Sequence, residues 1–145
     1  MLPFFLLWSA LFIPTRTAQT PTAQSPTAIE EIQSIIQQQL DAFNLNDYET
    51  AYHLASTQVR NQFSPDQFQE RIRTDYPQLT KSLRLTFDQI DLDTGRTHAV
   101  ARIEVTGFNH KKITAEYQLI HEDEGWKIDQ MAIVPLRASI RGRSS

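Results

Sequence analysis

The spacing of apolar residues changes at Pro77, and this change constrains the fold more than any other feature of the sequence. Before Pro77, apolar residues recur at three- and four-residue steps, as in amphipathic helices. After Pro77 they alternate with polar residues in four runs, as in half-buried strands. Helices followed by consecutive strands predict an α+β fold, in which N-terminal helices cover one face of an antiparallel sheet.

Three or four helices are expected before Pro77. The first begins at a capping box of Thr27 and Glu30, and its apolar stripe comprises Ile29, Ile32, Ile36, Leu40 and Phe43. A short second helix covers residues 48–55, with Asn46 or Asp47 as its cap. Another helix is expected to begin at Ser64, which caps it. Pro65 follows at the first helical position, and Gln67 follows three residues after the cap.

The strands are expected to form consecutive hairpins, because three of the four glycines fall between the alternating runs. Within the first strand, the apolar positions move from odd to even numbers between Phe87 and Ile90. Such a change of parity indicates a β-bulge. The sequence therefore predicts a curved sheet of four strands.

Four segments are expected along the chain. The apolar run from Leu2 to Ile13 predicts a signal peptide in residues 1–20, and it is shorter than the ~20 residues of a membrane-spanning helix. A polar linker follows in residues 21–26, then one domain in residues 27–136 and a flexible basic tail in residues 137–145. We therefore expect an exported protein, periplasmic or extracellular, with no stable membrane span after processing.

Composition argues against several classes of function. The chain has no cysteine, which excludes disulfides, thiol nucleophiles and cysteine-ligated metals. Its net charge is −3, and its basic residues concentrate only in the tail, so no nucleic-acid partner is expected. Glycine-rich phosphate loops and the signatures of metalloproteases and serine hydrolases do not occur. No cofactor or metal is predicted.

Several segments, in this order and spacing, resemble a known bacterial family. They are residues 39–43, residues 47–55, Arg60, residues 63–65, Phe68, Tyr76, Pro77 and residues 125–129. The family is domain of unknown function 4864, within the nuclear-transport-factor-two-like and SnoaL-like superfamily. The resemblance covers about residues 29–135 and implies a cone-like α+β fold. It does not imply an activity, because isomerases, dehydratases, hydrolases and binding proteins share this fold.

The inner face of the cone is expected to carry the odd-numbered residues of the second and third strands. Tyr117 is then its only polar residue and the best candidate for a site, although a core tyrosine with a satisfied hydroxyl is the more usual explanation. A shift of one residue in the strand would instead point Glu116 inward. The other candidates for a ligand pocket are His53, Tyr52 and Trp126, and no catalytic residue is assigned.

The remaining titratable residues have simpler explanations. His121 and the three acids after it could attract a cation, but they lie at a predicted hairpin, where charge keeps a turn soluble. Asp91 and Asp93 are expected at a solvated strand end. Strand alternation is expected to place Asp129 outside the cone.

These observations favour a non-catalytic binding or interaction module, with a small apolar pocket for a ligand or a surface for a partner protein. The nearly aliphatic inner face supports this hypothesis, because proton transfer needs a positioned acid or base. The alternative is a small isomerase, dehydratase or hydrolase that uses Tyr117. The open sheets of the superfamily also suggest a homodimer.

Overall fold

The computed structural model describes residues 27–135. The expected signal peptide, linker and basic tail lie outside these residues. The helices are α2 (Ala28–Asn44), α3 (Tyr48–His53), α4 (Thr57–Gln62), α5 (Pro65–Asp75) and the 3₁₀ helix η2 (Pro77–Leu79). The strands are β1 (Ser82–Leu92), β2 (His98–Gly107), β3 (Lys112–Glu122) and β4 (Gly125–Val134). None of these helices is long and apolar enough to cross a membrane.

The helices begin where the capping residues predicted. In α2, the Thr27 hydroxyl accepts the Glu30 amide at 3.2 Å, and the Glu30 carboxylate accepts the Thr27 amide at 2.9 Å. Ser64 forms the same kind of capping box at the start of α5. The cap of α3 is Asp47, which accepts the amide of Thr50. These bonds satisfy amides that the first helical turn leaves without partners.

The expected second helix, residues 48–55, corresponds to α3, which ends at His53. A further helix that the sequence analysis did not place, α4, starts after Ser56, whose hydroxyl accepts the amide of Val59 at 3.2 Å. The backbone between them pairs with β4 in a parallel bridge: Ser56 N–H donates to the Ile128 carbonyl at 2.8 Å, and Ile128 N–H donates to that of Leu54 at 2.9 Å. This bridge fixes α4 beside β4.

The four strands form an antiparallel sheet in the order β1-β2-β3-β4. The predicted bulge in β1 is present, between Phe87 and Gln89. The register of β1 also shifts between Ser82 and Arg84. A bulge that the sequence analysis did not anticipate lies in β4 at Asp129, because Leu119 pairs with Ile128 and Gln118 pairs with Gln130. Bulges on both outer strands increase the twist and curvature of the sheet.

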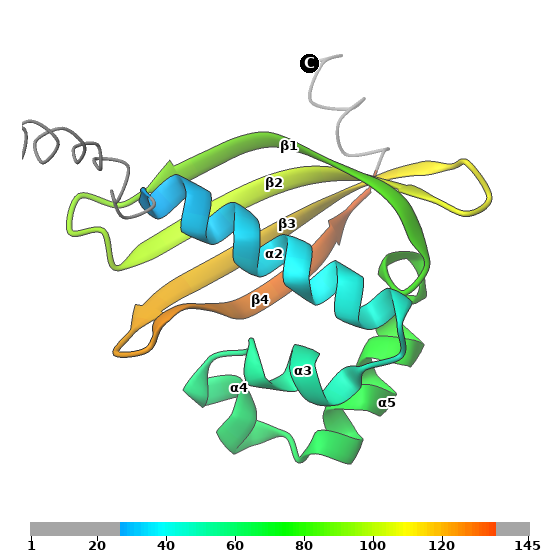
Figure 1. Cartoon of the computed structure of the whole chain (residues 1–145), viewed down its shortest axis with the longest axis horizontal. Coiled ribbons are helices and arrows are strands. Elements are labelled where there is room, and N and C mark those ends of the chain that lie inside the picture. The colour runs from blue at the N-terminus through cyan, green and yellow to red at the C-terminus, as the bar shows by residue number, and fades with distance from the viewer. Residues whose placement is uncertain (1–26, 136–145) are drawn as a thin grey trace, which may run out of the picture.

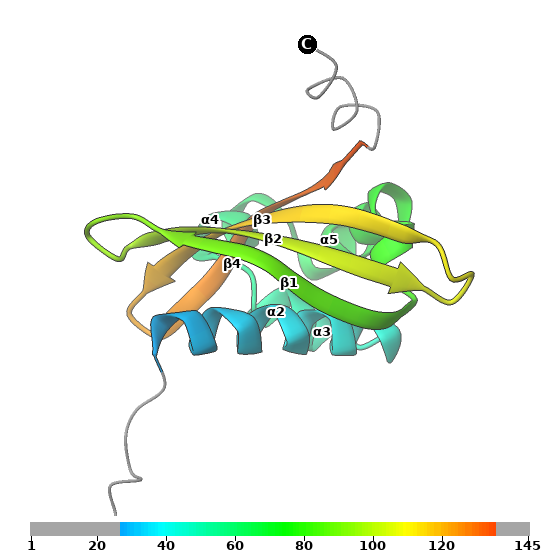
Figure 2. The ribbon, with the colours of Figure 1, turned by 90° about the horizontal axis from the view of Figure 1, so that it is seen from above.

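α2 runs along the concave face of the sheet, while α3, α4 and α5 gather beside β4 (Figure 1). Figure 2 shows α2 and the sheet as two layers. The odd-numbered residues of β2 and β3 face α2, as predicted: Ala99, Ala101, Ile103, Val105, Ala115, Tyr117 and Leu119 are buried, and Ile113 is half-buried. Glu116 lies on the other face, where it pairs with Arg102 at 3.2 Å, so the alternative register does not occur.

Candidate functional site

A cleft of about 480 Å³ lies between α4, α5 and β4. Its walls combine apolar and polar side chains in about equal share. The apolar ones include Val59, Phe63, Phe68, Ile72 and Met131, and the polar ones include Gln58, Gln62, Arg71, Asp129 and Gln130. Phe68 and Ile72 are nearly fully buried, so they form the packed base of the α5 wall. A concave site that joins apolar surface to polar groups can bind a small molecule.

Gln39 of α2 also lines this cleft and is only 1% exposed. Its Oε1 atom has no hydrogen-bond partner within residues 27–135. Gln39 follows Ile36 by three residues and precedes Phe43 by four, so it interrupts the apolar stripe of α2. An unpartnered buried polar atom costs about 1–3 kcal/mol of stability. This interruption of the stripe is visible in the sequence, although the sequence analysis did not identify it.

Two tyrosines lie next to the cleft. Tyr76 lines it and donates its hydroxyl proton to the Met131 carbonyl at 2.9 Å. Met131 pairs with Tyr117 across β3 and β4. Tyr117 is fully buried, and its hydroxyl has no partner among the described residues, so the expectation of a satisfied hydroxyl was wrong. Burial raises the pKa of Tyr117 well above its usual range, and the nearby Tyr76 raises it further. Tyr117 is therefore protonated at any physiological pH.

Strand alternation had suggested that Asp129 lies outside the cone. It lies instead at the rim of the cleft. The bulge in β4 changes the direction of its side chain, which accepts a hydrogen bond from the Ser56 hydroxyl at 2.7 Å. Arg71, also at the cleft, lies over the Phe63 ring at 5.5 Å and pairs with Asp75. The rim therefore carries one carboxylate and one cation, each of which has an intramolecular partner.

The four residues predicted for a ligand pocket lie outside the cleft. Tyr117 and Trp126 are buried in the core, and Trp126 packs edge-on against His121 at 5.1 Å. The Tyr52 hydroxyl lies 2.7 Å from the Phe63 carbonyl oxygen and 3.0 Å from that of Arg60, so it holds the α4–α5 connection. His53 is exposed, with Nδ1 2.8 Å from the Glu49 carbonyl oxygen. None of the four lines the cleft, although Tyr52 supports its wall through Phe68.

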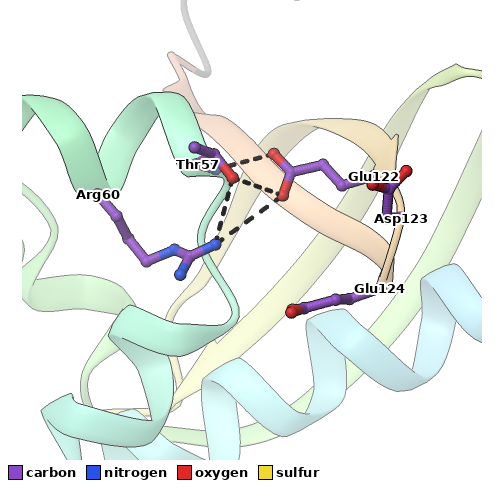
Figure 3. A pocket seen from close by; sticks show the side chains of 5 residues that line it. All are labelled: Thr57, Arg60, Glu122, Asp123 and Glu124. Carbon is purple, nitrogen blue, oxygen red and sulfur yellow. Dashed lines mark hydrogen bonds and ion pairs between the residues drawn. The ribbon is translucent and has the colours of Figure 1, made fainter.

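A second, polar pocket of about 440 Å³ lies where α4 meets the β3–β4 turn (Figure 3). Its centre is Glu122, which accepts the Thr57 amide at 2.8 Å and the Thr57 hydroxyl at 2.9 Å. Arg60 lies 3.9 Å from the same carboxylate. These groups satisfy one another and attach α4 to the sheet. No cluster of three metal-binding side chains occurs within residues 27–135.

Asp93 organises the β1–β2 turn. Its carboxylate accepts the amides of Thr97 at 2.7 Å and His98 at 3.0 Å, and the Thr97 hydroxyl at 2.9 Å. The hydrogen bond from the His98 amide is the main cause of a pKa lowered to about 2, with smaller contributions from Thr97 and from the His98 charge. Asp93 thus shapes a turn at the strand end.

Comparison with known proteins confirms the expected fold. Residues 25–140 match the family described as domain of unknown function (DUF4864), and the sequence matches no curated protein. Among solved structures, an NTF-2 like protein of unknown function from Shewanella oneidensis MR-1 is 14% identical, with a TM-score of 0.53, over 74% of this chain and 98% of that one. A phospholipid-binding protein from Ralstonia solanacearum, solved with a phospholipid, is 16% identical, with a TM-score of 0.50, over 81% and 85%. Such low identities show a shared fold alone.

Proposed function

The chain belongs to the family of domain of unknown function 4864, and within this family we propose that it is a binding module that receives a small, largely apolar ligand in the cleft beside β4. The observation that carries this proposal is the cleft itself, where apolar side chains lie beside an unpartnered polar group of Gln39. Its volume of about 480 Å³ falls in the range of roughly 300–1,000 Å³ that is usual for small-molecule sites.

The fold is compatible with this role. The phospholipid-binding protein from Ralstonia solanacearum shares the arrangement of helices and sheet. Because one fold can hold many functions, this likeness supports the proposal only as a precedent for an amphiphilic ligand. The stronger support comes from the cleft of this chain.

The enzymatic alternative requires a proton acceptor near Tyr117. A phenol with a strongly raised pKa can donate a hydrogen bond but cannot act as a base near neutral pH. No described side chain hydrogen-bonds to its hydroxyl. Asp129, the carboxylate at the cleft, already accepts a hydrogen bond from Ser56. The arrangement therefore favours binding over proton transfer.

Binding can be tested with the neutral apolar fluorophore N-phenyl-1-naphthylamine. We expect saturable binding of one molecule per chain to the purified protein. Val59→Trp should block it, because Val59 lines the cleft and a larger side chain fills the space. Val100→Trp is the matched control, since Val100 is 39% exposed near the start of β2 and is not part of the cleft. Equal binding by both variants would contradict the proposed site.

We also propose that the protein acts outside the cytoplasm, as the apolar run from Leu2 to Ile13 suggests. Deletion of residues 1–20 should keep the protein in the cytoplasm but leave it folded. Export of the shortened chain, or loss of its folding, would refute this role for the leader. Pairing of two copies stays a prediction, which sedimentation velocity would test.

A further inference from the structure

We infer that the ligand carries an uncharged hydroxyl group that meets the Gln39 carboxamide inside the cleft. This inference rests on the proposed function and specifies the chemical class of the ligand. An apolar residue at position 39 would complete the stripe between Ile36 and Phe43. The chain instead places there a carboxamide that is 1% exposed and whose oxygen is unpartnered.

A hydroxyl suits Gln39 because it can both donate and accept a hydrogen bond. It therefore satisfies the carboxamide whichever of its two polar atoms faces the ligand. Water entering the cleft could make the same contact. An alcohol replaces such a water without losing a hydrogen bond, and its apolar chain covers Phe63, Ile72 and Met131 of the walls.

A carboxylate fits this position less well. Gln39 is neutral, and the hydroxyl of the neighbouring Tyr76 already donates to the Met131 carbonyl. The charged group Asp129 at the cleft would repel an anion, while Arg71 is paired with Asp75. A buried carboxylate without a cation is strongly disfavoured. The cleft should therefore select an alcohol over the acid of the same chain length.

The test compares 1-decanol with decanoate, each displacing N-phenyl-1-naphthylamine at about pH 8, where the carboxylate is ionised. The wild-type protein should bind 1-decanol at least about threefold more tightly. Gln39→Leu should weaken 1-decanol binding by about 3- to 10-fold, the effect of one hydrogen bond, and should change decanoate binding little. Gln38→Leu is the matched control, because Gln38 is exposed on the same helix and does not line the cleft. It should leave both affinities unchanged.

Two results would overturn the inference while leaving the proposed function intact. In the first, both compounds displace the fluorophore equally, or Gln39→Leu and Gln38→Leu behave alike. In the second, decanoate binds more tightly and loses this advantage in Arg71→Gln, which would place the polar end of the ligand at the rim. If Gln39→Leu does not fold, the wild-type preference and the Arg71→Gln result still decide. Absence of binding by all three compounds would overturn both the inference and the proposed function.

Discussion

Tyr76 at the end of α5 donates its hydroxyl proton to the backbone carbonyl of Met131 in β4 at 2.9 Å. These two residues are 55 positions apart, and their bond joins the two walls of the cleft. Met131 lies just beyond the bulge at Asp129, where the inward-facing residues of β4 change from even-numbered to odd-numbered positions. The bond therefore attaches the end of α5 to β4 beside the cleft.

Tyr76→Phe should lower the free energy of unfolding by about 0.5–1.5 kcal/mol, the usual net contribution of one hydrogen bond. Urea denaturation measures this change. Tyr48→Phe is the matched control, because no hydrogen bond is found for the Tyr48 hydroxyl within residues 27–135, and its ring packs on Phe43. Equal effects of the two substitutions would show that the Tyr76 bond contributes nothing.

Local signals explain why much of the fold could be predicted from the sequence. The caps at Thr27 and Ser64 and the bulge after Phe87 each depend on residues that are neighbours in the chain. α4 carried no comparable signal, because none of its residues is buried and no apolar stripe marks it. Its position depends on backbone pairing between Ala55 and Ile128, which are far apart in the sequence.

The candidate site was predictable only in part, for the same reason. Alternation placed Tyr117 inside the cone correctly. The cleft, however, combines side chains from α2, α4, α5 and β4, which only tertiary packing brings together. The bulge at Asp129 reverses the expected side-chain direction there, and no change of parity as clear as the one in β1 revealed it. Gln39 could have been found as a polar residue on an apolar stripe.

Trp126→Ala should lower the free energy of unfolding by about 3–5 kcal/mol, because it leaves a large cavity in the core. Trp126 is 3% exposed and lies on the inward face of β4. Leu45→Ala serves as the control, since Leu45 is 75% exposed and should cost less than about 0.5 kcal/mol. Chemical denaturation of both variants checks the difference. A loss of under about 1 kcal/mol for Trp126→Ala would contradict its place in the core.

The protein should become less stable as the pH falls below about 4, because protonation of Asp93 removes a stabilising contribution. Its folded-state pKa of about 2 lies below the value of roughly 3.9 for an unfolded chain, so the ionised form favours folding. This contribution is complete above the unfolded value and disappears as the pH falls through about 2. In Asp93→Asn, the dependence of stability on pH should be weaker between about pH 4 and pH 2. Titration of the Asp93 carboxyl carbon by NMR checks the cause, and a midpoint near the unfolded value would refute it.

Tyr117→Phe should leave the free energy of unfolding unchanged or raise it by up to about 1–3 kcal/mol. The substitution removes a fully buried hydroxyl that has no partner among the described residues, and it keeps the ring that fills the core. Tyr76→Phe makes the same chemical change where the hydroxyl has a partner, so only Tyr76→Phe should lower the free energy of unfolding in urea denaturation. A loss of stability in Tyr117→Phe equal to that in Tyr76→Phe would show that a buried water satisfies the hydroxyl.

Tyr117→Phe also tests the enzymatic alternative. The wild-type protein is screened for turnover of small hydrophobic carbonyl and epoxide compounds, and any hit is repeated with Tyr117→Phe. If the variant folds but no longer turns the compound over, Tyr117 is catalytic and the proposal of a binding module fails.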